Sequence, residues 1–173
     1  MRKELFELSS QLGRALLQNK ASVTTAESCT GGGVANAITA VSGSSQWFHS
    51  AYVTYANHAK HNMLGVSEAL LLDQGAVSEA VVTEMVKGAA QAARADFAVA
   101  ISGIAGPSGG SPAKPVGTVW FAILGPQGIR SLKYQFAGDR EAVREQSVQI
   151  SLQQLLHQVS ECTTVHPYSN LQF

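Results

Sequence analysis

Residues 96–102 read Asp-Phe-Ala-Val-Ala-Ile-Ser, a nearly unbroken apolar run. Such a run predicts a strand that is buried on both faces, as in the sheets of α/β proteins. A loop rich in glycine and proline follows at residues 103–115. A long loop inside a compact domain is more often functional than not, and its glycines, hydroxyls and amides suit a phosphate or a sugar. Residues 96–115 therefore predict a buried strand that leads directly into a candidate ligand loop.

The rest of the chain alternates between helical and strand patterns. Helices are expected at residues 2–19, 30–41, 57–64, 67–73, 78–94 and from 139 onward, with Ser67 and Ser78 as the N-caps of the fourth and fifth. Strands are expected at 22–27, 47–55, 117–124 and 129–136. The last two strands flank Gly-Pro-Gln-Gly, residues 125–128, which predicts a hairpin. The predicted fold class is α/β, a three-layer α-β-α arrangement with a mixed sheet of about five or six strands. Residues 1–160 are expected to form a single domain, and residues 161–173, which lack periodicity, a tail or an arm packed on a partner subunit.

The composition narrows the class of protein. Of the 173 residues, 45% are hydrophobic and 14% are charged, and the formal net charge is zero. Nucleic-acid-binding modules usually carry a basic surface, so no nucleic-acid partner is expected. No apolar run approaches the ~18 residues of a membrane span, and two cysteines, Cys29 and Cys162, do not make a disulfide framework. We therefore expect a cytoplasmic protein without a membrane partner.

Residues 24–33, Thr-Thr-Ala-Glu-Ser-Cys-Thr-Gly-Gly-Gly, place two candidate nucleophiles where a strand ends and a helix begins. Ligand sites in α/β sheets favour such carboxyl ends, and a glycine-rich backbone can present free N–H groups to an anion or an oxyanion. The structural alternative is a Ser or Thr N-cap followed by glycines that let the helix pack on the sheet. Cys29 stays open beside Ser28, because a thiol at a helix N-terminus can have a lowered pKa, although a lone cysteine among small residues is more often a packing residue.

Residues 55–61, Tyr-Ala-Asn-His-Ala-Lys-His, lead from a strand end into a helix, so that Tyr55 and Lys60 can face one cleft. A lysine is a general base only when neutral, and lowering its pKa from about 10.4 to about 7 corresponds to roughly 4–5 kcal/mol. Burial or a nearby cation can supply that shift, and the alternative is a solvated lysine on a helix surface. His58 and His61 lie one helical turn apart, but without a third ligand near them they do not predict a metal site.

Residues 138–144, Gly-Asp-Arg-Glu-Ala-Val-Arg, open the last helix. Asp139 is expected to be its N-cap. Arg140 in the first turn opposes the helix dipole, so an arginine kept there indicates an anion partner. Arg144 is either a second such contact or a surface neighbour.

Several stretches, taken in order, resemble the C-terminal domain family of the competence/damage-inducible protein CinA. They are Thr25-Ala-Glu-Ser-Cys-Thr-Gly-Gly32, Val53-Thr-Tyr-Ala-Asn-His-Ala-Lys60, Gly75-Ala-Val-Ser78, Ser102-Gly-Ile-Ala-Gly-Pro107, Lys114-Pro-Val-Gly-Thr-Val119 and Gly138-Asp-Arg140. Within the family the chain is similar to the stand-alone nicotinamide-nucleotide amidases. It departs from the family pattern at Ser102, where many members have threonine, and at His58, where the residue is often acidic, which bears on the pH optimum.

The resemblance implies hydrolysis of the carboxamide of nicotinamide mononucleotide to nicotinate mononucleotide and ammonia, without a metal or cofactor. It also implies a serine–lysine mechanism in a homodimer, with Ser28 as nucleophile, Lys60 as base and Tyr55 beside them. The expected substrate-binding residues are Thr30, Gly31, Gly32, Ser45, Ser102, Gly103, Gly106, Arg140 and Arg144.

In the mechanism expected on this basis, Lys60 takes the Ser28 proton, with or without Tyr55 in the relay. Backbone N–H groups of residues 29–32 hold the oxyanion, and the loop at 103–111 holds the phosphate together with Arg140. Two alternatives remain at this point. One is a non-catalytic nucleotide-binding regulatory domain linked to competence or DNA damage, and the other is a Cys29-dependent hydrolase.

Overall fold

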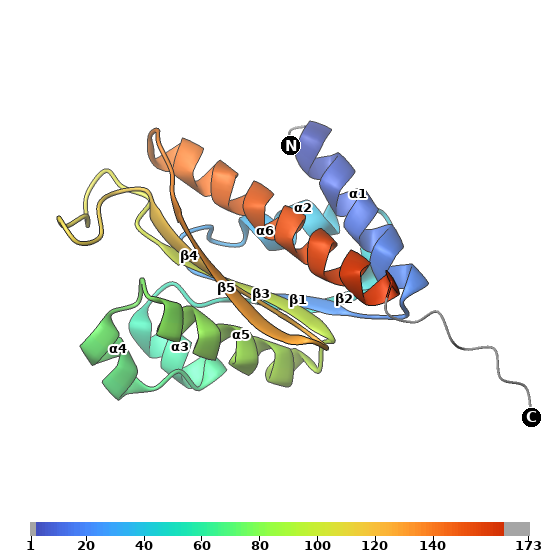
Figure 1. Cartoon of the computed structure of the whole chain (residues 1–173), viewed down its shortest axis with the longest axis horizontal. Helices are drawn as coiled ribbons and strands as arrows, with labels where there is room; N and C mark the ends of the chain where they lie inside the picture. The colour runs from blue at the N-terminus through green and yellow to red at the C-terminus, as the bar shows by residue number, and fades with distance from the viewer. Residues whose placement is uncertain (1–2, 165–173) are drawn as a thin grey trace, which may run out of the picture.

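The computed structural model describes residues 3–164, which form an α/β fold around one mixed sheet (Figure 1). The strands within these residues are β1 (Val23–Glu27), β2 (Phe48–Val53), β3 (Phe97–Gly103), β4 (Thr118–Gly125) and β5 (Gly128–Gln135). The helices are α1 (Lys3–Gln18), α2 (Gly33–Thr39), α3 (Asn57–Leu64), α4 (Glu68–Gln74), α5 (Glu79–Ala93) and α6 (Arg140–Thr164), with a short 3-10 helix, η1, at Ser44–Gln46. The predicted fold class is confirmed.

The sheet is five-stranded, with the order β2-β1-β3-β4-β5. β1, β2 and β3 are parallel, whereas β4 runs antiparallel to β3 and forms the predicted hairpin with β5. The connection from β1 passes to β2 on one side, and the chain later returns to place β3 on the other side of β1. The carboxyl ends of parallel strands at such a switch in strand order are the usual ligand positions of α/β sheets.

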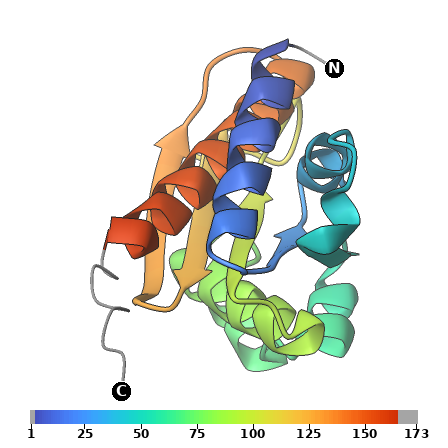
Figure 2. The same ribbon diagram turned by 90° about the vertical axis from the view of Figure 1, so that its right-hand side faces the viewer.

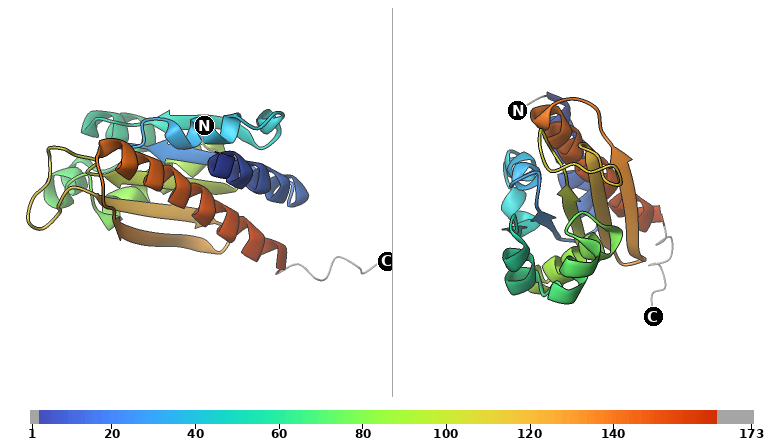
Figure 3. Two further views of the ribbon diagram at one scale, coloured as in Figure 1. Left: turned by 90° about the horizontal axis from the view of Figure 1, so that it is seen from above. Right: turned by 90° about the vertical axis from the view of Figure 1, so that its left-hand side faces the viewer.

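Helices cover both faces of the sheet. Figures 1 and 2 show α1, α2 and α6 over one face, and α3, α4 and α5 over the other. α6 packs on β3 and β4, and Figure 3 shows from above how it lies over the sheet.

The apolar run that becomes β3 supplies side chains to both layers. Val99 and Ile101 belong to the core under α1, α2 and α6, and Ala98 and Ala100 belong to the core under α5. All of these side chains are fully buried, as the run predicted. The alanines leave room for α5 to pack close to the sheet.

Predicted N-caps account for three helix starts. The cap side chains accept hydrogen bonds from backbone N–H groups three residues on: Ser67 from Leu70 (3.3 Å), Ser78 from Val81 (3.4 Å) and Asp139 from Ala142 (2.9 Å). These contacts confirm the capping interpretation, which rests on the unsatisfied N–H groups of a first helical turn.

α6 ends later than the sequence pattern predicts. It continues to Thr164, so residues 161–164, expected to begin a tail, are helical. Glu161 Oε1 lies 3.3 Å from His157 Nε2 one turn earlier, and Cys162 packs against the core, and both contacts favour the extension. The remainder of the expected tail, residues 165–173, lies outside the described residues. No helix between residues 3 and 164 is long and apolar enough to span a membrane.

At Gly88, α5 packs so closely against the end of α3 that no side chain fits between the two backbones. A Cβ atom at this position would lie 2.0 Å from the Leu64 carbonyl oxygen, so Gly88→Ala must push the helices apart. We expect this substitution to lower the free energy of unfolding by about 2 kcal/mol, measured by urea denaturation. Gln91→Ala, at an exposed position of α5, is the control and should stay within about 0.5 kcal/mol of wild type. A Gly88→Ala protein as stable as wild type would contradict the close contact.

Candidate active site

The carboxyl ends of β1, β2 and β3 bring Ser28, Thr54 and Ser102 side by side. The Ser28 N–H donates to the Ile101 carbonyl (3.0 Å), and the Thr54 N–H donates to the Glu27 carbonyl (2.9 Å). These bonds extend the parallel ladders one residue beyond β1 and β2. Ser28 therefore lies between Thr54 and Ser102 at the edge where a ligand is expected.

Lys60 points from α3 into this edge and contacts Ser28. Its Nζ lies 3.2 Å from Ser28 Oγ, 2.8 Å from the Thr54 carbonyl oxygen and 3.3 Å from the Tyr55 carbonyl oxygen. The Lys60 side chain is 1% exposed, which rules out the solvated-lysine alternative. The predicted pairing of Ser28 and Lys60 thus exists in the structure.

The three contacts of Lys60 fix the direction of its lone pair. A carbonyl oxygen only accepts hydrogen bonds, so the contacts to Thr54 and Tyr55 must use N–H groups of the amine. A neutral amine has two N–H groups and one lone pair. When both N–H groups go to the carbonyls, the lone pair is left for the Ser28 hydroxyl proton, which is the arrangement a general base requires.

Burial lowers the pKa of Lys60 to about 8, because the charged ammonium loses water without gaining a carboxylate partner. Within residues 3–164, no carboxylate forms an ion pair with it. With a pKa of about 8, part of the Lys60 population is uncharged near neutral pH and able to accept a proton.

Cys29 has the opposite character. Its side chain is 5% exposed and belongs to the core under α1, α2 and α6, on the other face of the sheet from Lys60. Burial raises the pKa of the thiol to about 11, so the reactive thiolate is scarce near pH 7. The packing interpretation of Cys29 fits the structure, and the thiol is a poor nucleophile.

Glu27 is a buried residue of the site that the sequence interpretation missed. Its fully buried carboxylate accepts hydrogen bonds from Thr25 Oγ1 (3.1 Å) and from three backbone N–H groups: Gly32 (3.1 Å), Val34 (3.1 Å) and Ala35 (2.9 Å). The N-cap residue of α2 is Gly32, without a side-chain cap, so the structural alternative of a Ser or Thr cap is wrong. An acidic residue at the end of a strand rich in threonine, directly before a glycine-rich turn, was the available signal.

The glycines of the turn have backbone rather than binding roles. Gly31 and Gly32 have φ angles of 59° and 92°, in the left-handed region that favours glycine. The Gly31 N–H donates to the Ser28 carbonyl, and the Gly32 N–H donates to Glu27. Of the N–H groups expected to hold an oxyanion, those of Cys29 and Thr30 donate to no other described residue. The candidate oxyanion donors are therefore these two.

The two arginines of α6 contact different parts of the site. Arg144 Nε and NH2 donate to the carbonyls of Cys29 and Thr30, each at 3.1 Å, so this side chain holds the turn after Ser28. Arg140 lies at the exposed rim, where NH1 donates to the Gly106 carbonyl (2.9 Å) and NH2 to the Tyr55 hydroxyl (2.7 Å). Arg140 thus ties the loop after β3 to the segment after β2.

The Tyr55 hydroxyl is not part of the Lys60–Ser28 contact. Its side chain is 57% exposed and bonds to Arg140, whereas Lys60 contacts only the Tyr55 carbonyl. The expected proton relay through Tyr55 is therefore not supported by the geometry.

Two buried hydroxyls at this edge, those of Thr54 and Ser102, have no hydrogen-bond partner among the described residues; the Thr30 hydroxyl also has none, but Thr30 lines a hollow beside α2 and α6 instead. Each side chain is at most 1% exposed. Buried polar groups are normally satisfied, so unpaired hydroxyls around Ser28 indicate where a polar ligand or water binds. Ser102 was expected here; Thr54 was not.

The structure places Ser45 away from the other expected binding residues and gives Gly103 a packing contact. Ser45 lies in η1, which precedes β2, so it sits at the amino-terminal edge of the sheet, opposite Ser28. Gly103 ends β3, where a Cβ atom would lie 2.6 Å from Val119 Cγ2, so its absent side chain serves packing.

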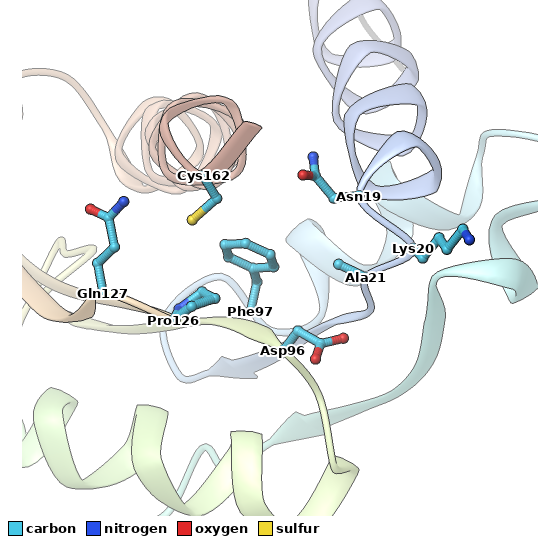
Figure 4. A pocket seen from close by; sticks show the side chains of 8 residues that line it. All are labelled: Asn19, Lys20, Ala21, Asp96, Phe97, Pro126, Gln127 and Cys162. Atoms are coloured by element: carbon cyan, nitrogen blue, oxygen red, sulfur yellow. The ribbon is translucent and has the colours of Figure 1, made fainter. Parts of the chain in front are cut away.

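A pocket of about 250 Å³ also lies at the amino-terminal edge (Figure 4). Figure 4 shows Cys162 of α6 above the ring of Phe97, with Asp96 directly before β3 and Lys20 in the turn after α1. None of the residues around Ser28 lines it. This pocket is separate from the candidate active site.

No group of three or more His, Cys, Asp or Glu side chains gathers in a metal-binding arrangement anywhere in residues 3–164. His58 is exposed, and His61 Nδ1 lies 2.9 Å from the Val66 carbonyl oxygen.

Comparisons with known proteins bear directly on this site. Residues 5–159 match the model of the CinA C-terminal domain. The nicotinamide-nucleotide amidohydrolase PncC of Escherichia coli K12 is 56% identical over 161 residues, covering 92% of this chain and 98% of the relative. The protein of the same name from Pseudomonas putida is 58% identical over 149 residues, covering 86% and 93%.

Solved structures agree with these relatives. A CinA superfamily protein from Klebsiella pneumoniae has a TM-score of 0.87 at 41% identity, covering 91% of this chain and 98% of that one. The competence/damage inducible protein CihA from Agrobacterium tumefaciens has a TM-score of 0.88 at 38% identity, covering 91% and 96%. The chain therefore belongs to the CinA C-terminal domain family.

Proposed function

We propose that this protein is an amidohydrolase that converts nicotinamide mononucleotide to nicotinate mononucleotide and ammonia. The observation that carries the proposal is the 3.2 Å contact between Lys60 Nζ and Ser28 Oγ, in a buried position where the lysine pKa is lowered to about 8. The substrate follows from relatives that are 56–58% identical and are named nicotinamide-nucleotide amidohydrolase.

In the first half-reaction, neutral Lys60 takes the proton of the Ser28 hydroxyl as Oγ attacks the carboxamide carbon. The carbonyl oxygen becomes an oxyanion that accepts hydrogen bonds from the Cys29 and Thr30 N–H groups. Protonated Lys60 then gives its proton to the amide nitrogen. The C–N bond breaks, ammonia leaves, and the acyl group remains on Ser28.

In the second half-reaction, water attacks the acyl carbon and Lys60 accepts a proton from it. The ester bond to Ser28 breaks, and Oγ recovers its proton from Lys60. The products are a carboxylic acid, which ionises to nicotinate mononucleotide, and an enzyme in its starting state. The Ser102 and Thr54 hydroxyls are the groups that we assign to orienting the carboxamide.

Arg140 is the residue that we assign to the substrate phosphate. It lies at the rim, and its two contacts are with an exposed hydroxyl and a carbonyl, which a phosphate can replace. The N-terminus of α2 is not available to the phosphate, because Glu27 already accepts its N–H groups. Binding of the phosphate away from the reacting amide favours the nucleotide over free nicotinamide.

A cytoplasmic location and a homodimer stay predictions.

Replacing Ser28 tests the nucleophile. Ser28→Ala should reduce ammonia release from nicotinamide mononucleotide by at least ~1,000-fold, because no acyl-enzyme can form. Cys29→Ala, the same change at the next residue of the turn, is the matched control and should keep activity within about fivefold of wild type. The reverse order of effects would assign the chemistry to the thiol, and no release by the wild-type protein would favour a nucleotide-binding domain.

The pH dependence tests the base. kcat/KM should rise with pH and level off above an apparent pKa of about 8, because Lys60 must lose its proton before it can accept one from Ser28. Lys60→Ala should lower kcat about 1,000-fold and remove this inflection. Lys87→Ala, at an exposed lysine of α5, is the control and should keep the wild-type profile. Wild-type turnover by Lys60→Ala would contradict the assignment of Lys60 as the base.

A further inference from the structure

The Glu27 carboxylate is fully buried, and the reaction scheme gives it no step. Within residues 3–164 it forms no ion pair with a basic side chain. Its four contacts are all with hydrogen-bond donors, one hydroxyl and three N–H groups. A buried charge is costly unless it is well hydrogen-bonded, so a fully satisfied carboxylate next to Ser28 calls for a role.

The three backbone donors belong to the start of α2. The first N–H groups of a helix have no partner within the helix and carry its positive dipole end, which makes them a usual anion site. Glu27 reaches this position from the last residue of β1, across the turn at residues 28–31. The carboxylate therefore fixes the strand, the turn and the helix to one another.

A second side chain, Arg144 of α6, also holds this turn. Arg144 donates to the carbonyls of Cys29 and Thr30, while Glu27 accepts from Gly32. With the carbonyls held by one side chain and the following N–H groups by the other, the Cys29 and Thr30 N–H groups are left for a ligand.

We propose that Glu27 is a positioning residue for the reaction at Ser28. It acts through the turn and does not touch the substrate. It keeps Ser28 Oγ and the Cys29 and Thr30 N–H groups in one fixed geometry. This inference rests on the proposed amidohydrolase function.

The pattern of donors makes glutamine a poor replacement. Oε1 accepts from Thr25 and Ala35, and Oε2 accepts from Gly32 and Val34. A glutamine amide has one oxygen and one NH₂ group, so in either orientation its NH₂ faces N–H donors. Glu27→Gln keeps the shape of the side chain and breaks the positioning of the turn.

The test measures steady-state kinetics of Glu27→Gln with nicotinamide mononucleotide. We expect kcat to fall about 100-fold, as for a small misplacement of reacting groups. KM should stay within about threefold of wild type, and the pH midpoint near 8 should be unchanged, because Lys60 is untouched. Asp96→Asn is the matched control: this carboxylate accepts from Ser22 N and Oγ at the opposite sheet edge, so activity should be unchanged.

The outcomes separate this inference from the proposed function. Ammonia release by wild type together with unchanged kcat in a folded Glu27→Gln protein overturns the inference alone. A lower kcat with a displaced pH midpoint also overturns it, because the carboxylate would then act on the charge of Lys60. Loss of folded protein in proportion to activity, with wild-type kcat per folded chain, indicates a purely structural role and overturns it as well. No release by wild type instead removes the proposed function.

A milder variant covers the case in which Glu27→Gln does not fold. Thr25→Val removes one of the four donors and keeps the shape of a buried strand residue. We expect kcat to fall about fivefold with KM unchanged, and wild-type kcat in Thr25→Val overturns the inference.

Discussion

The buried amine of Lys60 is the constraint on which the rest of the site depends. Lowering its pKa from 10.5 to about 8 means that the protonated form costs about 3 kcal/mol inside the protein. The folded state carries this cost below pH 8. The cost is relieved as the pH rises from 8 to 10.5, where the unfolded chain binds more protons than the folded one, so stability increases over that window. A protein keeps such a lysine only where the surrounding fold compensates for it.

The fold supplies that compensation by joining two strands and a helix at one point. The Lys60 amine needs Ser28 from the end of β1 and the Thr54 and Tyr55 carbonyls from the end of β2. The turn after Ser28 lies at the edge of the sheet, so that one side of the turn contacts the helix layer of α3 and the other side contacts the helix layer of α6. The Ser28 side faces Lys60 and α3, and the other side is held by Glu27 and by Arg144 of α6. The reacting side chains therefore lie on the α3 side of the turn, and the hydrogen bonds that hold the turn in place lie on its other side.

Local sequence patterns predicted the elements well, because those patterns act over a few residues. Ser67, Ser78 and Asp139 were expected as caps, and the apolar run of β3 was expected to be buried, as both are. The pairing of Ser28 with Lys60 came from a family resemblance; spacing alone left a solvated lysine open. Glu27 was missed because its donors include the N–H groups of a helix whose direction depends on tertiary packing. The separate contacts of Arg140 and Arg144, and the position of Ser45 at the far edge, likewise depend on how the layers stack.

The most direct test of the account is the titration of Lys60 itself, followed by NMR of selectively ¹³Cε-labelled lysine, with the Lys60→Met spectrum used to assign the signal. Burial against Ser28 and two carbonyls predicts a midpoint of about 8 for this one lysine. A midpoint near 10.5, that of an ordinary lysine, would contradict the claim that burial lowers the pKa of Lys60 enough for its neutral form to act as the base of the site.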